Sequence, residues 1–414
     1  MIRHAAVGLV AVTLALSSLS AFAGAIDVTR FDDPDPAGKN TGLSLREAIL
    51  IANGTPGPDT ITLHAGTYRL TRRGDDATAV AGDLDVTTPI TIEGDSTGAT
   101  IIDAKKAKDR AFEVLDGGEL TLRHVTVKGG SAELDGGAIL NVGTLTVESS
   151  TFTGNRAGES GGAISSEGGS CSLTDVVVTK NKASFNDGGG LNFTVAGSAA
   201  LDRVVVSSNS AGDTGGGVNS DDGVTVTMVD SLVSGNKSKR EGGGLDPSAG
   251  SLTLTNTTVS GNHSAKGGGI QLETGGLLAL NNVTIAGNKA REGAGLWTEA
   301  GTTATLTNTL IAKNSPFDCF GPVVSNGSNL IGKVDGCLVS GDTTGNIVGG
   351  PRPVKPVDPR LGPLRDNGGP SKTQALLPGS PAIDAVVGTC PPPAADQRGM
   401  PRSGTCDIGA FEVQ

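Results

Sequence analysis

Aromatic residues are scarce in this chain of 414 residues, where they make up 3% of the sequence and include one Trp and one Tyr. A core without large rings must be built from aliphatic side chains, which is unlike an ordinary globular enzyme. Four histidines are present, and HExxH, GxSxG, Walker A and CxxC motifs are all missing. The sequence therefore lacks the usual signatures of zinc proteases, α/β-hydrolases, P-loop enzymes and thioredoxin-like proteins.

Long apolar runs are also missing after the first 23 residues. The chain begins with a basic Arg3, continues with an apolar run at residues 7–19, and then has the small-residue site Ala21-Phe22-Ala23. This order predicts a secretory signal peptide cleaved after Ala23. The alternative is an uncleaved membrane anchor, for which the run is short. The formal net charge of −11 disfavours nucleic acid as a partner.

Glycine is abundant, with 64 residues, but it follows no three-residue collagen period. Instead, a motif of the form "SGN" followed by a glycine run recurs every 26 to 28 residues, as in "TVSGNHSAKGGGI" at residues 258–270. The anchor asparagines are Asn155, Asn181, Asn209, Asn236, Asn262, Asn288 and Asn314. A fixed period of this length is the signature of a stacked repeat architecture.

Apolar residues hold the same positions in nearly every repeat. Three residues before the anchor stand Val127, Phe152, Val178, Val206, Val233, Val259, Ile285 and Ile311. Eight residues before it stand Leu122, Val147, Leu173, Leu201, Met228, Leu254, Leu280 and Leu306. Within a repeat the apolar residues alternate, which is the period of a β-strand. Stacked repeats would turn these columns into internal ladders.

The fold that we expect is all-β: a right-handed parallel β-helix, or solenoid. Six residues before most anchors stands Asn or Asp, which tolerate the left-handed backbone of a sharp bend; His124, Ser149 and Arg203 are the exceptions. The glycine runs then form tight corners, where a Cβ atom would crowd the next coil.

The two ends of the chain are expected to differ from the repeats. Residues 44–53 predict a helix that plugs the first coil, with a capping box between Ser44 and Glu47. We expect a signal peptide at 1–23, an N-terminal cap at 24–85, β-helix repeats at 86–316 and an irregular C-terminal region at 317–414.

Four of the five cysteines lie in the C-terminal region, and export would favour disulfides there. Among three possible connectivities, we favour the local pairs Cys319–Cys337 and Cys390–Cys406. Cys171 occupies an apolar column, so we expect a buried free thiol.

Both terminal segments resemble known families. "LSLREAILIANGTPGPDTITLHAGTYRL" at residues 43–70 resembles the CSLREA domain, although Leu43 replaces the usual Cys. "DNGGPSKTQALLPGSPAIDA" at 366–385 and "CPPPAADQRGMPRSGTCDIGAFE" at 390–412 resemble the choice-of-anchor Q domain. "FTGN…GGAI" at 152–164 is similar to the repeat of polymorphic outer-membrane proteins. These resemblances imply a bacterial secreted or surface protein and carry no established catalytic residues.

Acidic residues recur at the corner that precedes the glycines, and Asp187, Asp213 and Glu241 are the candidates for catalysis. Lyases on solenoids use acids that hold Ca²⁺ together with a basic residue, and inverting hydrolases use two separated carboxyl groups. Ca²⁺ is therefore the one cofactor that we consider, and no other cofactor is expected. The competing interpretation is a solvated corner without a ligand.

A second candidate site is the column one residue after the post-glycine apolar residue, which we expect to point outward. It contains Asn192, Asn219, Asp246, Gln271 and Trp297. A row of amides that ends in a Trp could bind sugar hydroxyls and stack one ring. The competing interpretation is an ordinary polar sheet face.

We therefore expect an exported, monomeric β-helix that acts as a non-enzymatic surface, adhesion or glycan-binding module. Its partners would be an extracellular polysaccharide or a cell surface. The alternative function is a polysaccharide lyase or glycoside hydrolase.

Overall fold

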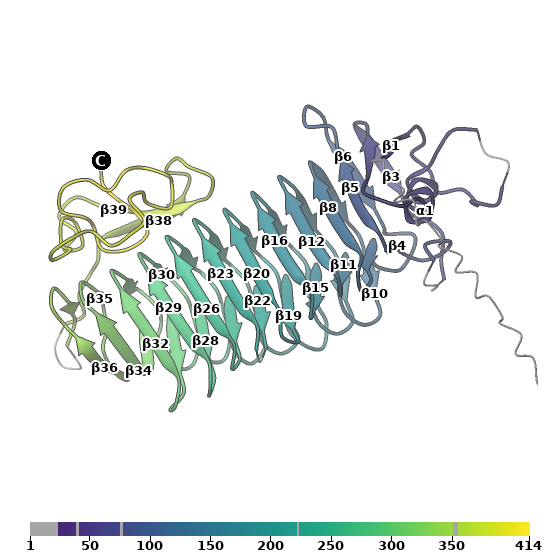
Figure 1. Ribbon diagram of the computed structural model, residues 1–414. Coiled ribbons are helices and arrows are strands. Elements are labelled where there is room, and N and C mark those ends of the chain that lie inside the picture. The colour runs from purple at the N-terminus through teal and green to yellow at the C-terminus, as the bar shows by residue number, and fades with distance from the viewer. Residues whose placement is uncertain (1–23, 39–40, 75–77, 222, 351–354) are drawn as a thin grey trace, which may run out of the picture.

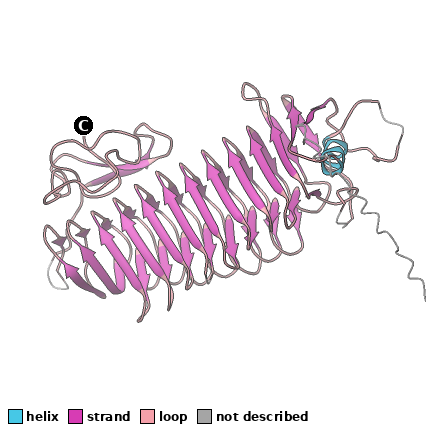
Figure 2. Cartoon of the chain, viewed as in Figure 1, coloured by secondary structure: helices cyan, strands magenta, loops and turns pink. Residues whose placement is uncertain are grey.

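Parallel strands stack into an elongated rod along most of the chain (Figures 1 and 2). The computed structural model describes residues 24–38, 41–74, 78–221, 223–350 and 355–414, so the predicted signal peptide lies outside the described residues. Each winding in the middle of the rod contributes one strand to each of three stacks. The all-β parallel β-helix expected from the repeat is confirmed, and so are its N-terminal helix and its disulfide-containing C-terminal region.

The first stack contains the longer strands of the rod, most of them five residues long. Its members are β1 (Gly24–Val28), β2 (Asp59–Leu63), β5 (Pro89–Glu93), β8 (Glu119–Arg123), β12 (Thr144–Glu148), β16 (Ser170–Thr174), β20 (Ser198–Asp202), β23 (Thr225–Val229), β26 (Ser251–Thr255), β29 (Leu277–Asn281), β32 (Thr303–Thr307), β34 (Cys319–Asn326) and β36 (Cys337–Asp342).

The second stack follows the bend after each strand of the first. Its members are β3 (Gly66–Arg69), β6 (Thr100–Asp103), β9 (Val125–Lys128), β13 (Thr151–Thr153), β17 (Val177–Thr179), β21 (Val205–Ser207), β24 (Leu232–Ser234), β27 (Thr258–Ser260), β30 (Thr284–Ala286), β33 (Leu310–Ala312), β35 (Leu330–Ile331) and β37 (Ile347–Val348). A short ladder continues from it in the early windings: β10 (Ser131–Ala132), β14 (Arg156–Ala157) and β18 (Lys182–Ala183).

The third stack follows the glycine corners. Its members are β4 (Leu84–Val86), β7 (Phe112–Val114), β11 (Ile139–Asn141), β15 (Ile164–Glu167), β19 (Leu191–Thr194), β22 (Val218–Ser220), β25 (Leu245–Pro247), β28 (Ile270–Leu272) and β31 (Leu296–Thr298). Strand β34 pairs with both β31 and β32, and it thereby joins the first and third stacks into one sheet.

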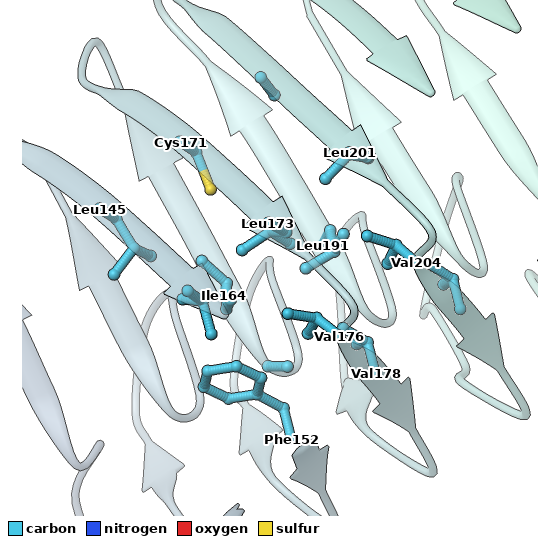
Figure 3. Close-up of a cluster of buried hydrophobic side chains, with 14 of the residues drawn as sticks. Leu145, Phe152, Ile164, Cys171, Leu173, Val176, Val178, Leu191, Leu201 and Val204 are labelled. Atoms are coloured by element: carbon cyan, nitrogen blue, oxygen red, sulfur yellow. The ribbon is translucent and has the colours of Figure 1, made fainter. Parts of the chain in front are cut away.

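The hydrophobic core fills the interior between the stacks, and its side chains form ladders along the rod. Leu254 pairs in register with Leu280, and Leu280 with Leu306. Each of these residues is at most 1% exposed. Figure 3 shows the same arrangement about three windings earlier, where Cys171 pairs in register with Leu145 and takes the position of a leucine in its column. Burial raises the pKa of this free thiol to about 12, so it stays protonated.

The anchor asparagines form a second ladder, made of hydrogen bonds. The Asn236 side chain donates to the Asn262 Oδ1 atom at 3.1 Å and to the Val206 carbonyl oxygen at 2.9 Å. Its own Oδ1 accepts from the backbone and side-chain nitrogens of Asn209. The pattern repeats up to Asn314, and there Asp318 Oδ1 takes the place of the next amide. Because every polar group of the buried amide is paired, the ladder connects one winding to the next without the free-energy cost of an unpaired buried group.

Bends and corners adopt the backbone geometry that their residues predict. In the repeats, a residue one or two positions before the second-stack strand has positive φ, at 46° in Asn256 and 53° in Asn282. The corner Gly242 has φ of 57°, and a Cβ on Gly243 would lie 2.5 Å from the carbonyl oxygen of Gly268 in the next winding. The glycines therefore serve close stacking as well as positive φ.

The N-terminal helix α1 (Leu45–Gly54) covers the first winding. Ser44 caps it, and the Glu47 carboxylate accepts from the Ser44 backbone, which confirms the capping box. Its Arg46 side chain is buried, pairs with Asp33 at 2.7 Å and donates to three backbone carbonyls. Within the described residues, no helix has the length and apolar character needed to cross a bilayer.

The stacks continue beyond the sequence repeat, which ends at Asn314. Strands β34 to β37 add further windings in parallel register. The disulfide between Cys319 and Cys337 joins β34 to β36, and Cys390 pairs with Cys406, so both expected pairs are confirmed.

Residues 355–414 fold back along the outer face of the second stack, and they include a hairpin of β38 (Leu361–Arg365) and β39 (Thr373–Leu376) (Figure 1). Gln397 donates to the Ser231 carbonyl and accepts from the Thr258 hydroxyl. A small apolar cluster around Leu310 and Ile408 seals this contact. The later windings of the second stack are therefore covered, and the earlier ones are open.

We predict that Asn236→Ala destabilises the rod by about 3 kcal/mol, because it leaves buried partners of the asparagine ladder unpaired. Lys237→Ala changes the exposed neighbour and should alter the free energy of unfolding by less than about 0.5 kcal/mol. Urea denaturation followed by circular dichroism measures both values. Equal stability of the two variants would contradict a stabilising role for the ladder.

Candidate functional site

The outward column of the third stack runs in register along the rod, as the sequence predicts. Asn192 pairs with Asn219 and Asn219 with Asp246, and from the next winding on Gln271 pairs with Trp297 and Trp297 with Phe320. The strands thus bring all the predicted ligand-binding residues into one row, which we call the amide row (Asn192, Asn219, Asp246, Gln271 and Trp297).

The expectation that the amide row faces solvent is wrong. Gln271 is fully buried, and even Trp297 is only 8% exposed. The glycine corner folds back over the row: a Cβ on Gly242 would lie 2.6 Å from the Asp246 Cβ atom, and one on Gly267 would lie 2.8 Å from the Gln271 Cβ atom. The alternation of the strand correctly predicts that these side chains point away from the core. It cannot predict that the glycine corner covers them.

Hydrogen bonding changes along the amide row. The Asn219 side chain donates to Asn192 Oδ1 at 3.0 Å and to Asp221 Oδ1 at 2.9 Å. In the next three windings, Asp246 Oδ2, both polar atoms of the Gln271 amide and Trp297 Nε1 are buried without a hydrogen-bond partner among the described residues. The same fold satisfies every amide of the asparagine ladder, although single buried atoms elsewhere in the described chain also lack a partner, as at Asn141 and Asn308.

The three candidate catalytic acids lie on successive windings beside the amide row. Asp187 Oδ1 accepts from the Thr214 backbone and hydroxyl at 2.9 and 3.0 Å, and burial raises its pKa. Asp213 pairs with Arg240 at 3.1 Å. Glu241 pairs with Lys266 at 3.2 Å. The acids are therefore neighbours in space, and two of them already have a cationic partner.

Glu273 belongs to the site, although the sequence analysis does not identify it. Burial and a hydrogen bond with the Glu241 carboxyl raise the pKa of Glu273 to about 7. Burial, followed by repulsion from Glu273 and Glu241, raises the pKa of Asp246 well above its usual range. The detectable signal was a third column, three residues after the apolar one, which holds Asp221, Glu273 and Glu299.

Aromatic rings end the amide row at its C-terminal side. The Lys266 ammonium lies 5.1 Å from the Trp297 ring centroid, and the rings of Trp297 and Phe320 stack with centroids 6.2 Å apart. Phe320 is 40% exposed, so it offers the accessible ring that was expected of Trp297. It lies past the last repeat, where column counting no longer applies.

A group of acids that could hold a metal ion lies elsewhere, in the first windings. Oxygen atoms of Asp83, Asp85 and Glu113 come within 4.8 Å of one another. The Arg110 guanidinium already lies 3.2 Å from Asp83 and 2.8 Å from Glu113. A cation there would have to displace this ion pair, so these residues fit a divalent metal poorly. The Ca²⁺ site expected at the corner acids stays a prediction.

Comparison with known proteins gives one short family match. Residues 149–167 match the Chlamydia polymorphic membrane protein repeat. This confirms the resemblance expected for that stretch, whereas the resemblances of the two terminal segments stay predictions. A search of curated proteins finds no match.

Among solved structures, the crystal structure of pectate lyase Pel9A is similar to this chain. The two are 14% identical over 95% of this chain and 98% of that one, with a TM-score of 0.46. We draw no conclusion about activity from this likeness.

The raised pKa of Glu273 predicts a pH-dependent stability. Its ordinary value is 4.5, so between about pH 4.5 and 7 the folded protein holds a proton there that the unfolded chain has released. This contribution to stability is complete below that window and is lost as the pH rises through about 7. Glu273→Gln keeps a neutral side chain and should lose less thermal stability than the parent between about pH 5 and 8.

Thermal unfolding at several pH values measures this difference. Glu292→Gln removes an exposed carboxyl from a nearby corner and serves as the matched control, which should follow the parent. Parallel curves for the parent and the Glu273 variant would contradict the shift.

Proposed function

We propose that this chain is an exported or cell-surface β-helix that binds a glycan and does not cleave it. The observation that carries this proposal is the hydrogen-bonding deficit at Asp246, Gln271 and Trp297, beside the Glu241–Glu273 carboxyl pair. A buried polar group without a partner costs about 1–3 kcal/mol, so a purely structural column would be expected to pair these atoms. Because these atoms are buried, an ordered water would connect them to a sugar bound at the carboxyl pair beside them.

The chemistry of the surrounding residues favours a neutral or amino-bearing sugar. Carboxylates accept hydrogen bonds from hydroxyl and ammonium groups, and Glu273 and Glu299 add negative charge on one side of the amide row. A polyuronate would be repelled unless a cation bridged the two. Phe320 provides an exposed ring on which one sugar could stack.

Two features disfavour cleavage. Glycosidases place their two carboxyl groups about 5–5.5 Å or 6.5–9.5 Å apart, with the scissile bond between them. Glu241 and Glu273 instead share a hydrogen bond. The basic residues that a lyase would use, Arg240 and Lys266, pair with Asp213 and Glu241.

A polysaccharide lyase or glycoside hydrolase is the second candidate function. It is favoured by the same carboxyl pair, because Glu273, whose pKa is raised, could donate a proton beside a second carboxyl group. Substrate binding would then have to move the two groups apart.

Export is supported by the two disulfides of the C-terminal region, since such bonds persist in oxidising compartments. The match to a membrane-protein repeat points in the same direction.

A glycan array with neutral, amino-bearing and uronate polymers tests the proposal, followed by calorimetry on the best ligand. Glu241→Gln/Glu273→Gln keeps side-chain size and should weaken binding by about tenfold, which corresponds to the loss of two charge-assisted hydrogen bonds. Asp116→Asn/Glu119→Gln removes two exposed carboxyl groups from an early winding and should bind like the parent.

A reducing-sugar assay on the same ligands decides between binding and cleavage. We expect no new chain ends. Steady release that Glu273→Gln abolishes would establish the enzymatic alternative, and equal binding by both double variants would place the glycan elsewhere.

A further inference from the structure

A row of basic side chains lies on another part of the rod, one residue after each ladder asparagine. Parallel bridges connect its members from one winding to the next. We call it the basic row, and it consists of Arg156, Lys182, Ser210, Lys237, His263, Lys289 and Ser315. Neighbouring parallel strands are about 4.8 Å apart, so the cations recur at roughly one or two such steps.

The basic row is exposed and carries no counter-charge. Arg156, Lys182, Lys237 and Lys289 all lie on the surface. Within the described parts of the chain, none of their side chains forms an ion pair with a carboxylate. The protein has a formal net charge of −11, yet these four cations lie on one line. Positive charge is therefore concentrated on this part of the surface.

Hydroxyl groups run parallel to the basic row. Two residues before the first four anchors stand Thr153, Thr179, Ser207 and Ser234, which pair in register on β13, β17, β21 and β24. The Ser207 hydroxyl donates to the Thr179 hydroxyl at 3.1 Å.

The position between the hydroxyls and the ladder asparagines is occupied by small or basic residues. In the same windings these are Gly154, Lys180, Ser208 and Gly235, all with positive φ. No carboxylate interrupts these columns, and the glycines keep the surface low.

The basic row begins at a shallow depression of about 520 Å³. Lys105, Lys128 and Arg156 line it, together with the backbone of Gly129 and Gly130. Lys128 is partly neutralised by Asp103 at 3.7 Å. At the other end, the C-terminal region covers the outer face from β24 to β33, where Gln397 bonds to Ser231 and Leu232 is buried, so the fully open part of the surface extends from β9 to β21.

We propose that the basic row binds a linear anionic polysaccharide whose carboxylate or sulfate groups repeat along the chain. Regularly spaced cations match a polymer with regularly spaced anions, and the adjacent hydroxyl row offers partners to sugar hydroxyls. The low glycine surface lets an extended polymer lie along the rod. This surface shares no residue with the amide row, and it is opposite in charge to the acids there, so the inference goes beyond the proposed function.

The chemistry on this surface fits a glycan better than a nucleic acid. Non-specific nucleic-acid sites combine a basic groove with aromatic platforms on which bases stack. The columns that form this surface contain basic, hydroxyl, alanine and glycine residues and no Phe, Tyr or Trp. Nucleic acid is therefore an outcome that the test must exclude.

Biolayer interferometry with immobilised alginate, heparin, dextran and single-stranded DNA tests the proposal on the full mature chain. We expect binding to alginate, heparin or both, none to dextran, and an affinity that falls about tenfold or more between roughly 50 and 200 mM salt. Alginate alone would indicate carboxylate recognition, and heparin alone would indicate sulfate recognition.

Arg156→Glu/Lys182→Glu reverses two charges in the open part of the basic row and should weaken binding by at least about tenfold. Lys355→Glu/Lys372→Glu makes the same change in net charge on exposed residues of the C-terminal region, and it should weaken binding less than about twofold. Circular dichroism and melting temperature confirm that both variants fold.

Three results would overturn the proposal: no polyanion bound at low salt, equal loss of binding in the two double variants, or tighter binding of single-stranded DNA than of either polysaccharide at equal charge concentration. Loss of neutral-glycan binding in the carboxyl-pair variants has no bearing on this result, so failures of the two proposals can be told apart.

Discussion

The asparagine ladder is the constraint on which the rest of the rod depends. Each amide links three windings, because its oxygen accepts from the winding before, and its nitrogen donates to that winding's carbonyl and to the next amide. A shift of one winding along its neighbour would break these hydrogen bonds, so the ladder keeps the turns between strands in register. Every other column, whether apolar, acidic or basic, inherits that register, and a one-residue shift in any winding would exchange the core face for the outer face.

Because the windings are in register, a residue type that recurs at one position of the repeat forms a continuous line along the rod. One residue after the anchor the chain places cations, and beside the third stack it places carboxyl groups, so two charged lines run along one scaffold. The glycine corner links structure to function here, because its close packing buries the amide row. That burial leaves Asp246, Gln271 and Trp297 short of partners and is the main cause of the raised pKa of Asp246.

Much of the candidate site follows from column counting. Asp187, Asp213 and Glu241 were expected as neighbours and lie on successive windings, and the amide row has the expected alignment. Its burial was not predictable from strand period, since the covering corner belongs to a loop whose path depends on three-dimensional packing. Glu273 was missed because its column contains mixed residue types. Phe320 was missed because it lies where the repeat has already ended.

The sequence by itself determined the repeat, the apolar ladders, the positive-φ bends and the pairing of cysteines that lie close along the chain. These features are set by local chemistry and by a period short enough to count. Only the tertiary structure decided that the windings continue through β34 to β37 without a repeat, and that residues 355–414 return over the second stack. Both outcomes rest on contacts between segments more than a hundred residues apart or on pairing without a pattern, where burial of the available apolar and polar surface, and no local preference, selects the arrangement.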